Sequence, residues 1–540
     1  MRDPQLLSPG RSLGRLVLAA RVDPGAIALE VEGAALSYGE LRTRAGKIAR
    51  ILLEGRAASS PRLGAVLATR SAPDYVGVLG TLLAGSGYVP LNAKFPAERS
   101  AQMLAASRAT TLVASSRAAD TLRALLVAVP QRLLVVLPDA ADVAELASTF
   151  PQHAFVGAEA VEAVDPLEEA PAVDEAAIAY LMFTSGTTGT PKGVMVTHAN
   201  VLHHLDVMAR RYQVVPGDRF SHAFDLTFDL SVFDLFLPWS CGASVHVIPP
   251  SEQMAPARFV REHALTVWFS VPSVAMMLRG LRLLKPGSLP SLRLSLFCGE
   301  RLTPDVARAW ADAAPQSVLE NLYGPTEATI ACTLYRWDSG LSPAASTGGS
   351  VPIGRPYDGH AAAIVDPSTL ALVEAGEAGE LCIRGPQVAT GYLDDAARTA
   401  ERFVSMPWDA GTENRWYRTG DIARVDVRGD LVHLGRNDDQ VKLRGFRVEL
   451  GEIEARLREV AGTDFAGVVA WPPLAPTHVV AFVARSAVAA ADILSGIARV
   501  LPEYMVPKDV RVLGEMPLNA NGKMDKGALR RLLEDADGNT

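Results

Sequence analysis

The segment FTSGTTGTPKG, from Phe183 to Gly193, holds three glycines, one proline, one lysine and five hydroxyl side chains in eleven positions. Glycines let backbone N–H groups approach an oxyanion closely, hydroxyl groups donate hydrogen bonds, and Lys192 adds a mobile positive charge. The apolar run 177–182 predicts a buried strand leading into this loop, where open α/β sheets place ligand loops. We therefore predict a phosphate-binding loop. Its expected donors are Thr184, Ser185, Gly186, Thr187, Thr188, Gly189 and Lys192.

The spacing in this loop differs from that of the P-loop, which requires Gly-Lys followed by Ser or Thr. Here Lys192 follows Pro191 and precedes Gly193. The difference excludes the ordinary kinase or GTPase interpretation. A solvated Ser/Thr/Gly turn is the plain structural alternative.

Further segments occur in a fixed order along the chain and resemble the motifs of the adenylate-forming superfamily, which contains acyl-CoA synthetases, luciferases and the adenylation domains of nonribosomal peptide synthetases. The resemblance covers roughly residues 30–530 and includes the phosphate loop. Any one of these strings could be a chance turn, but the ordered set could not. They are LSYGEL (36–41), LAGSGYVPLNAKFP (83–96), FDLS (228–231), NLYGPTE (321–327), GELCIR (379–384), YRTGD (417–421), GRNDDQVKLRGFRVELGEIE (435–454), LPEYMVP (501–507) and NANGK (519–523).

Composition indicates a large soluble enzyme. The chain has 540 residues, 49% of them hydrophobic, and a formal net charge of −8. It carries no basic block, which argues against nucleic-acid or polybasic membrane binding. No apolar run reaches the roughly 18 residues that span a bilayer, and we expect a cytoplasmic protein. Four cysteines lie far apart without a CxxC pair, so we expect small buried residues rather than disulfides or a zinc site.

Short Val/Leu/Ile runs alternate with helical patterns between about residues 40 and 330, which is typical of βαβ units. Examples are a strand at 133–137 and a helix at 306–314. Strand-like segments at 361–365 and 380–384 suggest a small β subdomain. We expect an α/β protein with a large N-terminal domain of βαβ-type sheets plus that subdomain (1–428), followed by a small, mobile α+β C-terminal domain (429–540).

The resemblance implies roles for residues of the nucleotide site. The Tyr323 ring would stack on adenine, Gly324 would belong to the same nucleotide site, and Thr326 would contact the α-phosphate. Glu327 matches the family's magnesium ligand, and a carboxylate oxygen is a suitable hard donor for Mg²⁺. Asp421 would accept hydrogen bonds from the ribose hydroxyls, supported by Arg436. The cofactors implied are ATP and Mg²⁺, and the plain alternative for YGPTE is a Gly-Pro turn with an exposed acid.

Lys523 follows an Asn-Ala-Asn-Gly turn near the C-terminus. The matching lysine of the family bridges the substrate carboxylate and the α-phosphate, so we expect Lys523, Lys192 and Thr326 to be catalytic. Taken alone, such a turn is usually a solvated hairpin. One position departs from the family, because Arg428 stands at the hinge where an aspartate or a lysine is usual. Hinge positions tolerate many residue types, so the change puts only the kinetics of domain rotation in doubt.

Asp229 corresponds to the residue that pairs with the substrate ammonium in amino-acid-activating members. Its alternatives are a simple N-cap for the following helix and replacement in this role by Asp225. The positions that correspond to the side-chain pocket are apolar or small, which predicts a small to medium neutral amino acid such as proline, valine, alanine or an aminobutyrate. They are Leu230, Phe233, Ser270, Leu296, Cys298, Leu322, Ile330 and Ala331.

No segment resembles the serine attachment motif of a carrier domain, so we expect a freestanding enzyme that transfers the acyl group to the phosphopantetheine thiol of a separate carrier protein. Peptide, pyrrole or polyketide-hybrid biosynthesis would use such a product. Two rivals stay open. One is an acyl-CoA ligase that uses a non-amino acid and free coenzyme A, and the other is an inactive homologue that acts as a nucleotide-binding scaffold.

Overall fold

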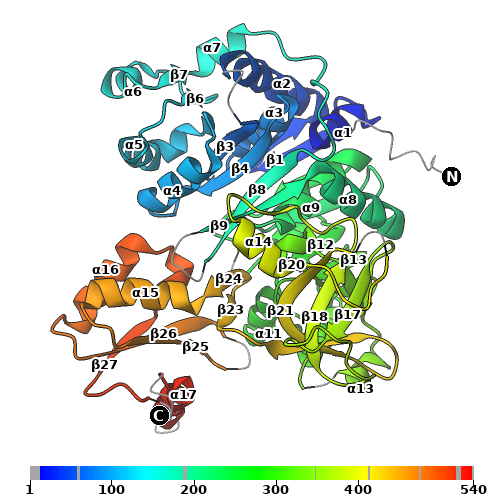
Figure 1. The fold of residues 1–540 in the computed structure, drawn as a ribbon. Helices are drawn as coiled ribbons and strands as arrows, with labels where there is room; N and C mark the ends of the chain where they lie inside the picture. The colour runs from blue at the N-terminus through cyan, green and yellow to red at the C-terminus, as the bar shows by residue number, and fades with distance from the viewer. Residues whose placement is uncertain are drawn as a thin grey trace. The chain divides into compact units, whose positions relative to one another are not determined.

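The computed structural model describes residues 12–56, 61–186, 191–253, 255–346, 348–411, 414–473, 476–518 and 524–537. They form two compact units. Unit 1 contains the described residues of 1–93, 104–182 and 193–437, and unit 2 those of 94–103, 183–192 and 438–540. Helices and strands alternate along most of the chain, which confirms the expected α/β class (Figure 1).

The first sheet of unit 1 has a parallel centre and antiparallel edges. Strands β1, β11, β10, β12, β13 and β14 pair in parallel, whereas β2, β15 and β16 pair antiparallel at the two sides. Parallel strands end at one edge of the sheet, which brings the residues that follow them together. In spatial order the strands are β16 (Arg355–Pro356), β15 (Thr333–Arg336), β14 (Val318–Tyr323), β13 (Leu294–Phe297), β12 (Val267–Ser270), β10 (Arg219–His222), β11 (Ser244–Val247), β1 (Ile27–Val31) and β2 (Ala34–Ser37).

The second sheet contains the strand that leads into the predicted phosphate loop. Its central strands are parallel, and β3 and β4 are buried along their whole length, as strands covered on both faces are. In spatial order the strands are β19 (Gly391–Tyr392), β9 (Lys192–Thr197), β8 (Ile178–Thr184), β4 (Gly87–Asn92), β3 (Leu63–Ala68), β5 (Thr111–Ala114), β6 (Leu134–Val136) and β7 (Ala154–Val156).

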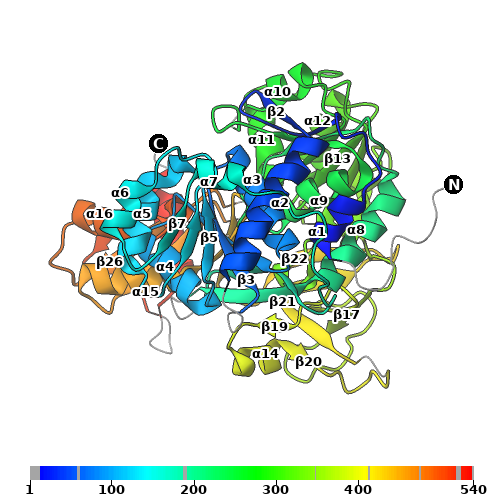
Figure 2. The same cartoon turned by 90° about the horizontal axis from the view of Figure 1, so that it is seen from above.

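Helices pack on these sheets and on one another. Figure 2 shows α2 beside α3, and α1 grouped with α8 and α9. Ser37 and Glu40 form a capping box at the start of α2, so the local sequence fixes where that helix begins. The helices of unit 1 are α1 (Leu13–Ala19), α2 (Tyr38–Gly55), α3 (Ala72–Leu83), α5 (Ala119–Ala128), α6 (Ala144–Thr149), α7 (Ala158–Ala163), α8 (His198–Tyr212), α9 (Leu230–Cys241), α10 (Ala257–Glu262), α11 (Pro272–Gly280), α12 (Pro304–Ala313), α13 (Ser342–Ala345) and α14 (Ala396–Arg402), with 3-10 turns η1 (Ser116–Ala118) and η2 (Thr326–Ala328).

The small β subdomain is present as an antiparallel sheet of unit 1. Its core strand β21 pairs with β18, β20 and β22. The hairpin between β21 and β22 contains Arg428, and the pairing of these strands continues to Arg436. The strands are β17 (Ala361–Val365), β18 (Gly379–Arg384), β20 (Phe403–Val404), β21 (Trp416–Val425) and β22 (Leu431–Arg436).

Unit 2 has its own apolar cores, one between α15, α16 and the strands and a second under α17. Helix α4 (Ala97–Ser107) begins in unit 2. The remaining elements are β23 (Gln440–Leu443), β24 (Phe446–Glu449), β25 (Ala466–Trp471), β26 (His478–Ala484), β27 (Asp509–Leu513), α15 (Leu450–Ala461), α16 (Ala490–Val500), α17 (Lys526–Asp537) and the 3-10 turn η3 (Glu503–Met505).

Several local expectations can be compared with the structure. The strand expected at 133–137 is β6, the helix expected at 306–314 is α12, and the strand expected at 361–365 is β17. Along the chain the units divide between Asn437 and Asp438, after the expected domain boundary at Arg428. The long β21–β22 pairing explains this difference, because it ties the residues after Arg428 to unit 1.

All four cysteines are among the described residues, and none of them forms a disulfide. Cys298, Cys332 and Cys382 are buried and Cys241 is half-buried, so the expectation of small buried residues holds for three of them. Among the described helices, none combines the length and the apolar character that crossing a membrane requires.

Candidate active site

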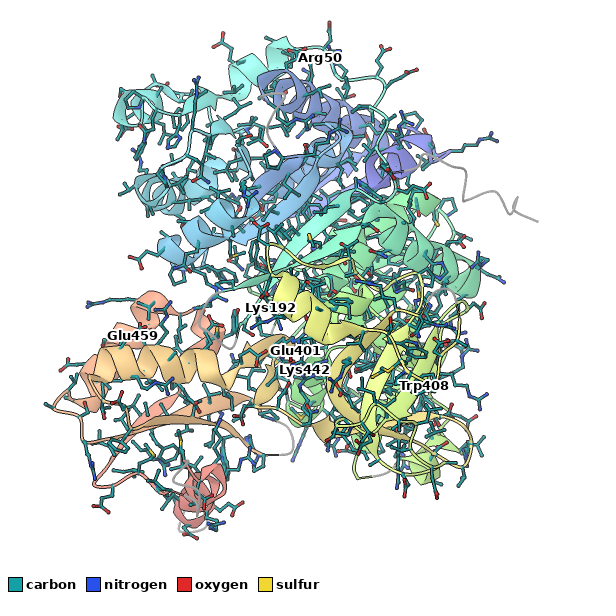
Figure 3. All side chains as sticks on the ribbon, in the orientation of Figure 1. Arg50, Lys192, Glu401, Trp408, Lys442 and Glu459 are labelled. Carbon is teal, nitrogen blue, oxygen red and sulfur yellow. The ribbon has the colours of Figure 1, made fainter. Side chains whose placement is uncertain are left out.

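The described part of the phosphate loop belongs to unit 2, and its donors contact oxygen atoms there. The Ser185 hydroxyl donates to the Arg447 carbonyl at 2.7 Å and accepts the Glu449 N–H at 3.1 Å. The Gly186 N–H donates to a Glu452 carboxylate oxygen at 3.3 Å. Lys192, labelled in Figure 3, begins β9, and its Nζ lies 3.8 Å from a Glu449 carboxylate oxygen.

Thr184 ends β8, and its Oγ1 is buried with no hydrogen-bond partner among the described residues. A buried hydroxyl without a partner is costly, so a ligand oxygen is a suitable acceptor for it. The loop therefore carries hydroxyl, amide and ammonium donors within one short segment, and its binding of phosphate stays a prediction. Thr187, Thr188 and Gly189 lie outside the described residues, as does the predicted catalytic Lys523.

Asp421 lies on β21 and accepts hydrogen bonds from three side chains of unit 1. The Tyr323 hydroxyl donates at 2.5 Å, Arg436 Nη1 at 2.7 Å, and His433 Nε2 lies at 3.2 Å. Burial and the neighbouring Asp421 charge raise the pKa of Tyr323, so its hydroxyl keeps the proton that it donates. The structure thus brings three predicted nucleotide residues, Tyr323, Asp421 and Arg436, into one cluster.

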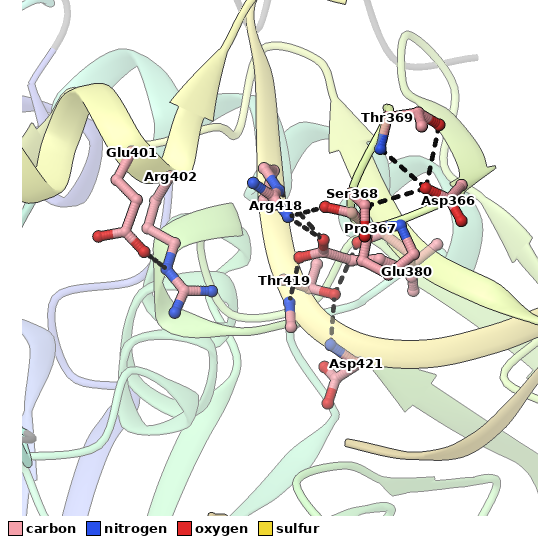
Figure 4. A network of polar contacts seen from close by, with 12 residues as sticks. Asp366, Pro367, Ser368, Thr369, Glu380, Glu401, Arg402, Arg418, Thr419 and Asp421 are labelled. Carbon is pink, nitrogen blue, oxygen red and sulfur yellow. Dashed lines mark hydrogen bonds and ion pairs between the residues drawn. The ribbon is translucent and has the colours of Figure 1, made fainter. Parts of the chain in front are cut away.

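The buried side chain of Glu380 stabilises the turn that carries Asp421. Figure 4 shows Glu380, which accepts the Gly420 N–H at 3.0 Å and pairs with Arg418 at 2.6 Å. The Thr419 hydroxyl accepts the Asp421 N–H at 3.0 Å and donates to the Leu381 carbonyl at 2.7 Å. Gly420 has φ of +74°, a backbone conformation that glycine adopts without strain. These contacts fix the direction of the Asp421 carboxylate.

Two residues of this cluster were missed in the sequence. Glu380 falls inside the GELCIR segment, but nothing in that string indicates a buried acid under a turn. His433 and Arg436 differ by an odd number of positions on β22, so plain alternation places them on opposite faces. A β-bulge between Ile422 and Ala423 shifts the register, so that His433 pairs with Ala423 and Arg436 with Asp421. This irregularity has no sequence signal that we could have used.

Tyr323 ends β14, and the segment that follows makes a close turn. A Cβ atom on Gly324 would lie 2.5 Å from Ala331 Cα, so only glycine fits there. Thr326 begins η2 and is half-exposed. Glu327 is fully buried, and its Oε1 accepts the Tyr392 hydroxyl at 2.7 Å. A buried carboxylate held in one orientation fits the donor that a hard cation such as Mg²⁺ prefers.

Asp229 occupies the N-cap position of α9 but makes no side-chain cap hydrogen bond. Instead, its Oδ2 accepts the backbone N–H of Ile330 at 3.1 Å. Burial raises the pKa of Tyr88 and Tyr180, and the Asp229 charge adds to that effect in both. The carboxylate therefore faces the segment after β14 rather than the first turn of its own helix, which argues against the plain N-cap interpretation.

Asp225 is engaged in local structure. Its Oδ1 accepts the N–H and the hydroxyl of Thr227, at 3.0 and 2.6 Å, and its Oδ2 accepts from Asn92 at 2.8 Å. This is the Asx-type turn that aspartate commonly makes. Both of its oxygens are thus used in holding the loop before α9.

The residues predicted to line the side-chain pocket are brought together in the main core of unit 1. They lie on the parallel strands β12, β13 and β14, in the segments that follow β13 and β14, or on the first turns of α9. All are 5% exposed or less, and all except Ser270 belong to one apolar cluster. The set is Leu230, Phe233, Ser270, Leu296, Cys298, Leu322, Ile330 and Ala331.

The backbone is strained at Thr329 and Ile330, next to Asp229 and to the apolar wall formed by the predicted pocket residues. Thr329 and Ile330 are β-branched and have φ of +54° and +70°, and each such residue costs about 1–3 kcal/mol. The fully buried Gln387 holds the segment, because its Nε2 donates to the Thr329 and Ala331 carbonyls at 2.9 and 2.8 Å. Sequence reasoning missed Gln387, since a glutamine in a loop carries no signal of this role.

A model of the family described as AMP-binding enzyme matches residues 17–393. The chain belongs to the AMP-binding enzyme family. Among curated relatives of this AMP-binding enzyme, tyrocidine synthase 3 of Brevibacillus parabrevis is 34% identical over 514 residues, covering 94% of the chain and 7% of the relative. Phosphinothricin tripeptide synthetase PhsC of Streptomyces viridochromogenes is 34% identical over 528 residues, covering 96% of the chain and 44% of the relative. The chain thus spans less than half the length of either.

Solved structures are similar over almost the whole AMP-binding enzyme. The Vibrio cholerae adenylation domain AlmE, in complex with glycyl-adenosine-5'-phosphate, has a TM-score of 0.84 at 32% identity, with 97% of each chain covered. IdnL7 has a TM-score of 0.71 at 37% identity, covering 98% of this chain and 99% of that one. Holo-PA1221, which contains adenylation and PCP domains, has a TM-score of 0.78 at 25% identity, covering 98% and 85%.

These relationships confirm the resemblance drawn from the motifs. The AMP-binding enzyme is an amino acid adenylating ligase of the nonribosomal peptide synthetase type, and it binds ATP. The mixed α/β fold with a larger and a smaller part is likewise that of adenylation domains. The identity of the amino acid and the fate of the acyl group belong to the proposal that follows.

Proposed function

We propose that this enzyme activates a small to medium neutral amino acid as its aminoacyl adenylate and transfers the acyl group to the phosphopantetheine thiol of a carrier protein. The observation that carries the proposal is the position of Asp229. Its carboxylate is 8% exposed and accepts the Ile330 N–H beside the buried apolar residues of the predicted pocket. A negative charge beside apolar side chains suits an ammonium group that carries a neutral side chain.

The Asp229 interpretation is supported over its two alternatives. The missing cap hydrogen bond speaks against a role limited to starting α9. The contacts of Asp225 with Asn92 and Thr227 speak against Asp225 as the ammonium ligand. In the proposed complex the substrate ammonium donates to Asp229, and the side chain lies against residues such as Leu296 and Cys298.

The nucleotide would be held by the polar and charged side chains that the motifs name. Asp421 accepts hydrogen bonds from the ribose hydroxyls, Arg436 supports that contact, and the Tyr323 ring packs on adenine. Thr184, Ser185 and Lys192 donate to phosphate oxygens, and Thr326 donates to the α-phosphate. Preorganised donors of this kind stabilise charge that develops in the transition state.

In the first step, a carboxylate oxygen of the amino acid attacks the α-phosphorus, and pyrophosphate leaves. Lys523 would neutralise the approaching anions from its place near the C-terminus. Glu327 would hold Mg²⁺, which supplies positive charge to the phosphate oxygens. In the second step the carrier thiolate attacks the acyl carbon and AMP leaves, so that a thioester replaces the mixed anhydride.

The acceptor is proposed from the relatives. Holo-PA1221 joins adenylation and PCP domains, and NpsA-ThdA is an artificial fusion of an adenylation domain to a PCP domain. A carrier-bound phosphopantetheine is therefore the first acceptor to test. Free coenzyme A carries the same thiol, which makes it the natural competitor in the experiment.

The test is an ATP–pyrophosphate exchange panel followed by a transfer assay. We expect exchange with alanine, aminobutyrates, valine or proline, and none above background with aspartate, lysine, acetate or benzoate. Mass spectrometry of a holo carrier should then show the acyl adduct, with coenzyme A as the matched acceptor. Exchange restricted to simple carboxylic acids, with acylation of coenzyme A, would overturn the proposal in favour of an acyl-CoA ligase. Absence of exchange with every acid in the presence of bound ATP would favour the scaffold alternative.

A further inference from the structure

Three metal-ligating side chains that the proposed function does not use meet in unit 1. Glu30 lies on β1, His246 on the neighbouring parallel strand β11, and His263 directly after α10. Glu30 and His246 are register partners across the two strands. The Nδ1 atoms of His246 and His263 each lie 2.9 Å from a different oxygen of Glu30. One ligand atom of each residue therefore lies within 4.8 Å of the other two.

Ser244 lies on the far side of the His246 ring. The Ser244 hydroxyl lies 3.3 Å from the Asp218 carbonyl and 2.9 Å from His246 Nε2, and when it donates to Asp218 it accepts the proton of Nε2. With the proton on Nε2, a neutral His246 ring presents a lone pair at Nδ1. This is the arrangement of metal-ligating histidines, whose second nitrogen donates to an outer group that orients the ring.

In that tautomer the Nδ1 lone pair faces a carboxylate oxygen of Glu30. His246 is 5% exposed, and its Nδ1 lies 2.9 Å from this oxygen. The distance is that of an N–H···O hydrogen bond when Nδ1 carries the proton, and a cation takes the place of this proton when Nδ1 does not carry it. Tetrahedral metal–ligand bonds of about 2.0–2.2 Å place neighbouring ligand atoms about 3.4 Å apart, so Glu30 and His246 would separate by roughly half an ångström when an ion binds.

The third ligand is held in place by its surroundings. The His263 ring stacks on Phe259, with ring centroids 3.9 Å apart and an interplanar angle of 25°. The His263 carbonyl accepts from Arg219 Nη1 at 3.1 Å, which fixes the backbone after α10. The ring is 25% exposed, so an ion and a water molecule have a route from solvent.

We infer that Glu30, His246 and His263 bind one divalent transition-metal ion of the Zn²⁺ class. Two imidazole nitrogens and a carboxylate oxygen are ligands that Zn²⁺ accepts, with water in the remaining position. Mg²⁺ prefers oxygen ligands in octahedral geometry, so the site discriminates against the ion of the adenylation reaction. The ion would tie β1 and β11 to the segment after α10 and would thereby stabilise this side of the sheet.

The experiment uses the untagged protein after dialysis against EDTA, titrated with Zn²⁺ in the presence of excess Mg²⁺ and followed by calorimetry. We expect one Zn²⁺ bound per chain and a rise in the melting temperature on binding. His263→Gln should weaken the affinity about tenfold or more and remove the rise in melting temperature. His203→Gln is the matched control. Like His263, His203 is half-buried and lies near a second histidine, with the centroids of the His203 and His360 rings 5.3 Å apart. This control variant should bind Zn²⁺ as the unaltered protein does.

A second variant distinguishes the loss of a metal ligand from misfolding. Glu30→Gln keeps the size of the side chain but removes its charge, and its melting temperature without metal reports on folding directly. A folded Glu30→Gln protein that also binds Zn²⁺ at least tenfold more weakly supports the site. Zn²⁺ affinity that is equal in the unaltered protein, Glu30→Gln and His263→Gln would overturn the inference. Absence of Zn²⁺ binding by the unaltered protein would overturn it as well, leaving direct contacts between Glu30 and the two histidines.

Discussion

Asp229 and Asp421 are both buried carboxylates of unit 1, and the surrounding structure holds them in different ways. Asp421 accepts from Tyr323, Arg436 and His433, whose side chains come from β14 and β22. Asp229 accepts a backbone N–H from the strained Ile330 and lies beside an apolar wall. The first carboxylate is oriented by polar side chains, whereas the second depends on the backbone of a distant segment. We expect the first region to serve every substrate equally and the second to choose among substrates.

The largest expected effect comes from Asp229. We predict that Asp229→Ala lowers kcat/KM for the amino acid by about a hundredfold or more, because removing one partner of a buried charge pair costs about 3–5 kcal/mol. Initial rates of pyrophosphate exchange over a range of amino acid concentrations, at saturating ATP, measure the loss. KM for ATP should change little.

Two further variants separate charge from fold at this position. Asp229→Asn keeps an oxygen that can accept the Ile330 N–H, so it should fold normally and still lose amino acid recognition. Asp225→Asn should keep the substrate preference. If Asp229→Asn exchanges with the same specificity constant as the unaltered enzyme, the contrast between the two aspartates fails.

Lys523 tests the chemical step, in contrast to the two aspartates, which are proposed to bind the amino acid and the nucleotide. Lys523→Ala should lower the rate of adenylate formation about 10²–10³-fold, as the loss of one transition-state donor does. Transfer from a supplied aminoacyl adenylate should be retained, and single-turnover assays of the two half-reactions measure both. Lys526→Ala is the control, since Lys526 pairs with Asp439 at 2.9 Å and Glu454 at 3.0 Å. Equal loss of both half-reactions in Lys523→Ala would refute the role given to this lysine.

We expect a substitution of Asp421 to weaken nucleotide binding without changing amino acid recognition. Asp421→Asn should raise KM for ATP roughly tenfold, because a hydrogen bond to a charged group contributes about 1.5–3 kcal/mol. The substrate preference across the amino acid panel should stay the same. Comparison with 2'-deoxy- and 3'-deoxy-ATP sharpens the test as a double-mutant cycle. Removing a ribose hydroxyl should harm the unaltered enzyme more than the variant, and equal penalties would place the ribose elsewhere.

The smallest expected effect is a change of preference at the apolar wall. Cys298→Leu adds bulk beside Leu296, so the ratio of kcat/KM for alanine over valine should rise, within the range of about 10–200-fold that a change of one methylene can produce. Cys382→Ala serves as the control, since Cys382 is also fully buried but lies on β18, in the antiparallel sheet of the β subdomain. An unchanged ratio in Cys298→Leu would remove this residue from the predicted pocket.

Much of the fold could be predicted because its signals are local. Apolar runs at 133–137 and 361–365 read as strands and are strands, and the periodic segment 306–314 is helical. The division between the units was harder. Arg428 looks like a boundary in the sequence, but the pairing of β21 with β22 extends past it to Arg436, and strand pairing is a long-range property.

The candidate site likewise contains residues that the sequence identified and residues that it did not. Polar motifs named Tyr323, Asp421 and Arg436, and the structure brings those three together. Three residues carried no signal in the sequence. Glu380 is a buried acid next to a turn, Gln387 stabilises a strained loop, and His433 is shifted in register by a β-bulge. None of these roles has a sequence pattern.

By itself the sequence determined the class of fold and the family, because apolar runs and ordered motifs are patterns that a short stretch of chain carries on its own. Only the tertiary structure decided which carboxylate faces the apolar wall, which backbone is strained beside it, and that Glu30, His246 and His263 meet. The physical reason is distance along the chain. These contacts join residues from separate strands and helices, and their energy exists only after the sheets have formed.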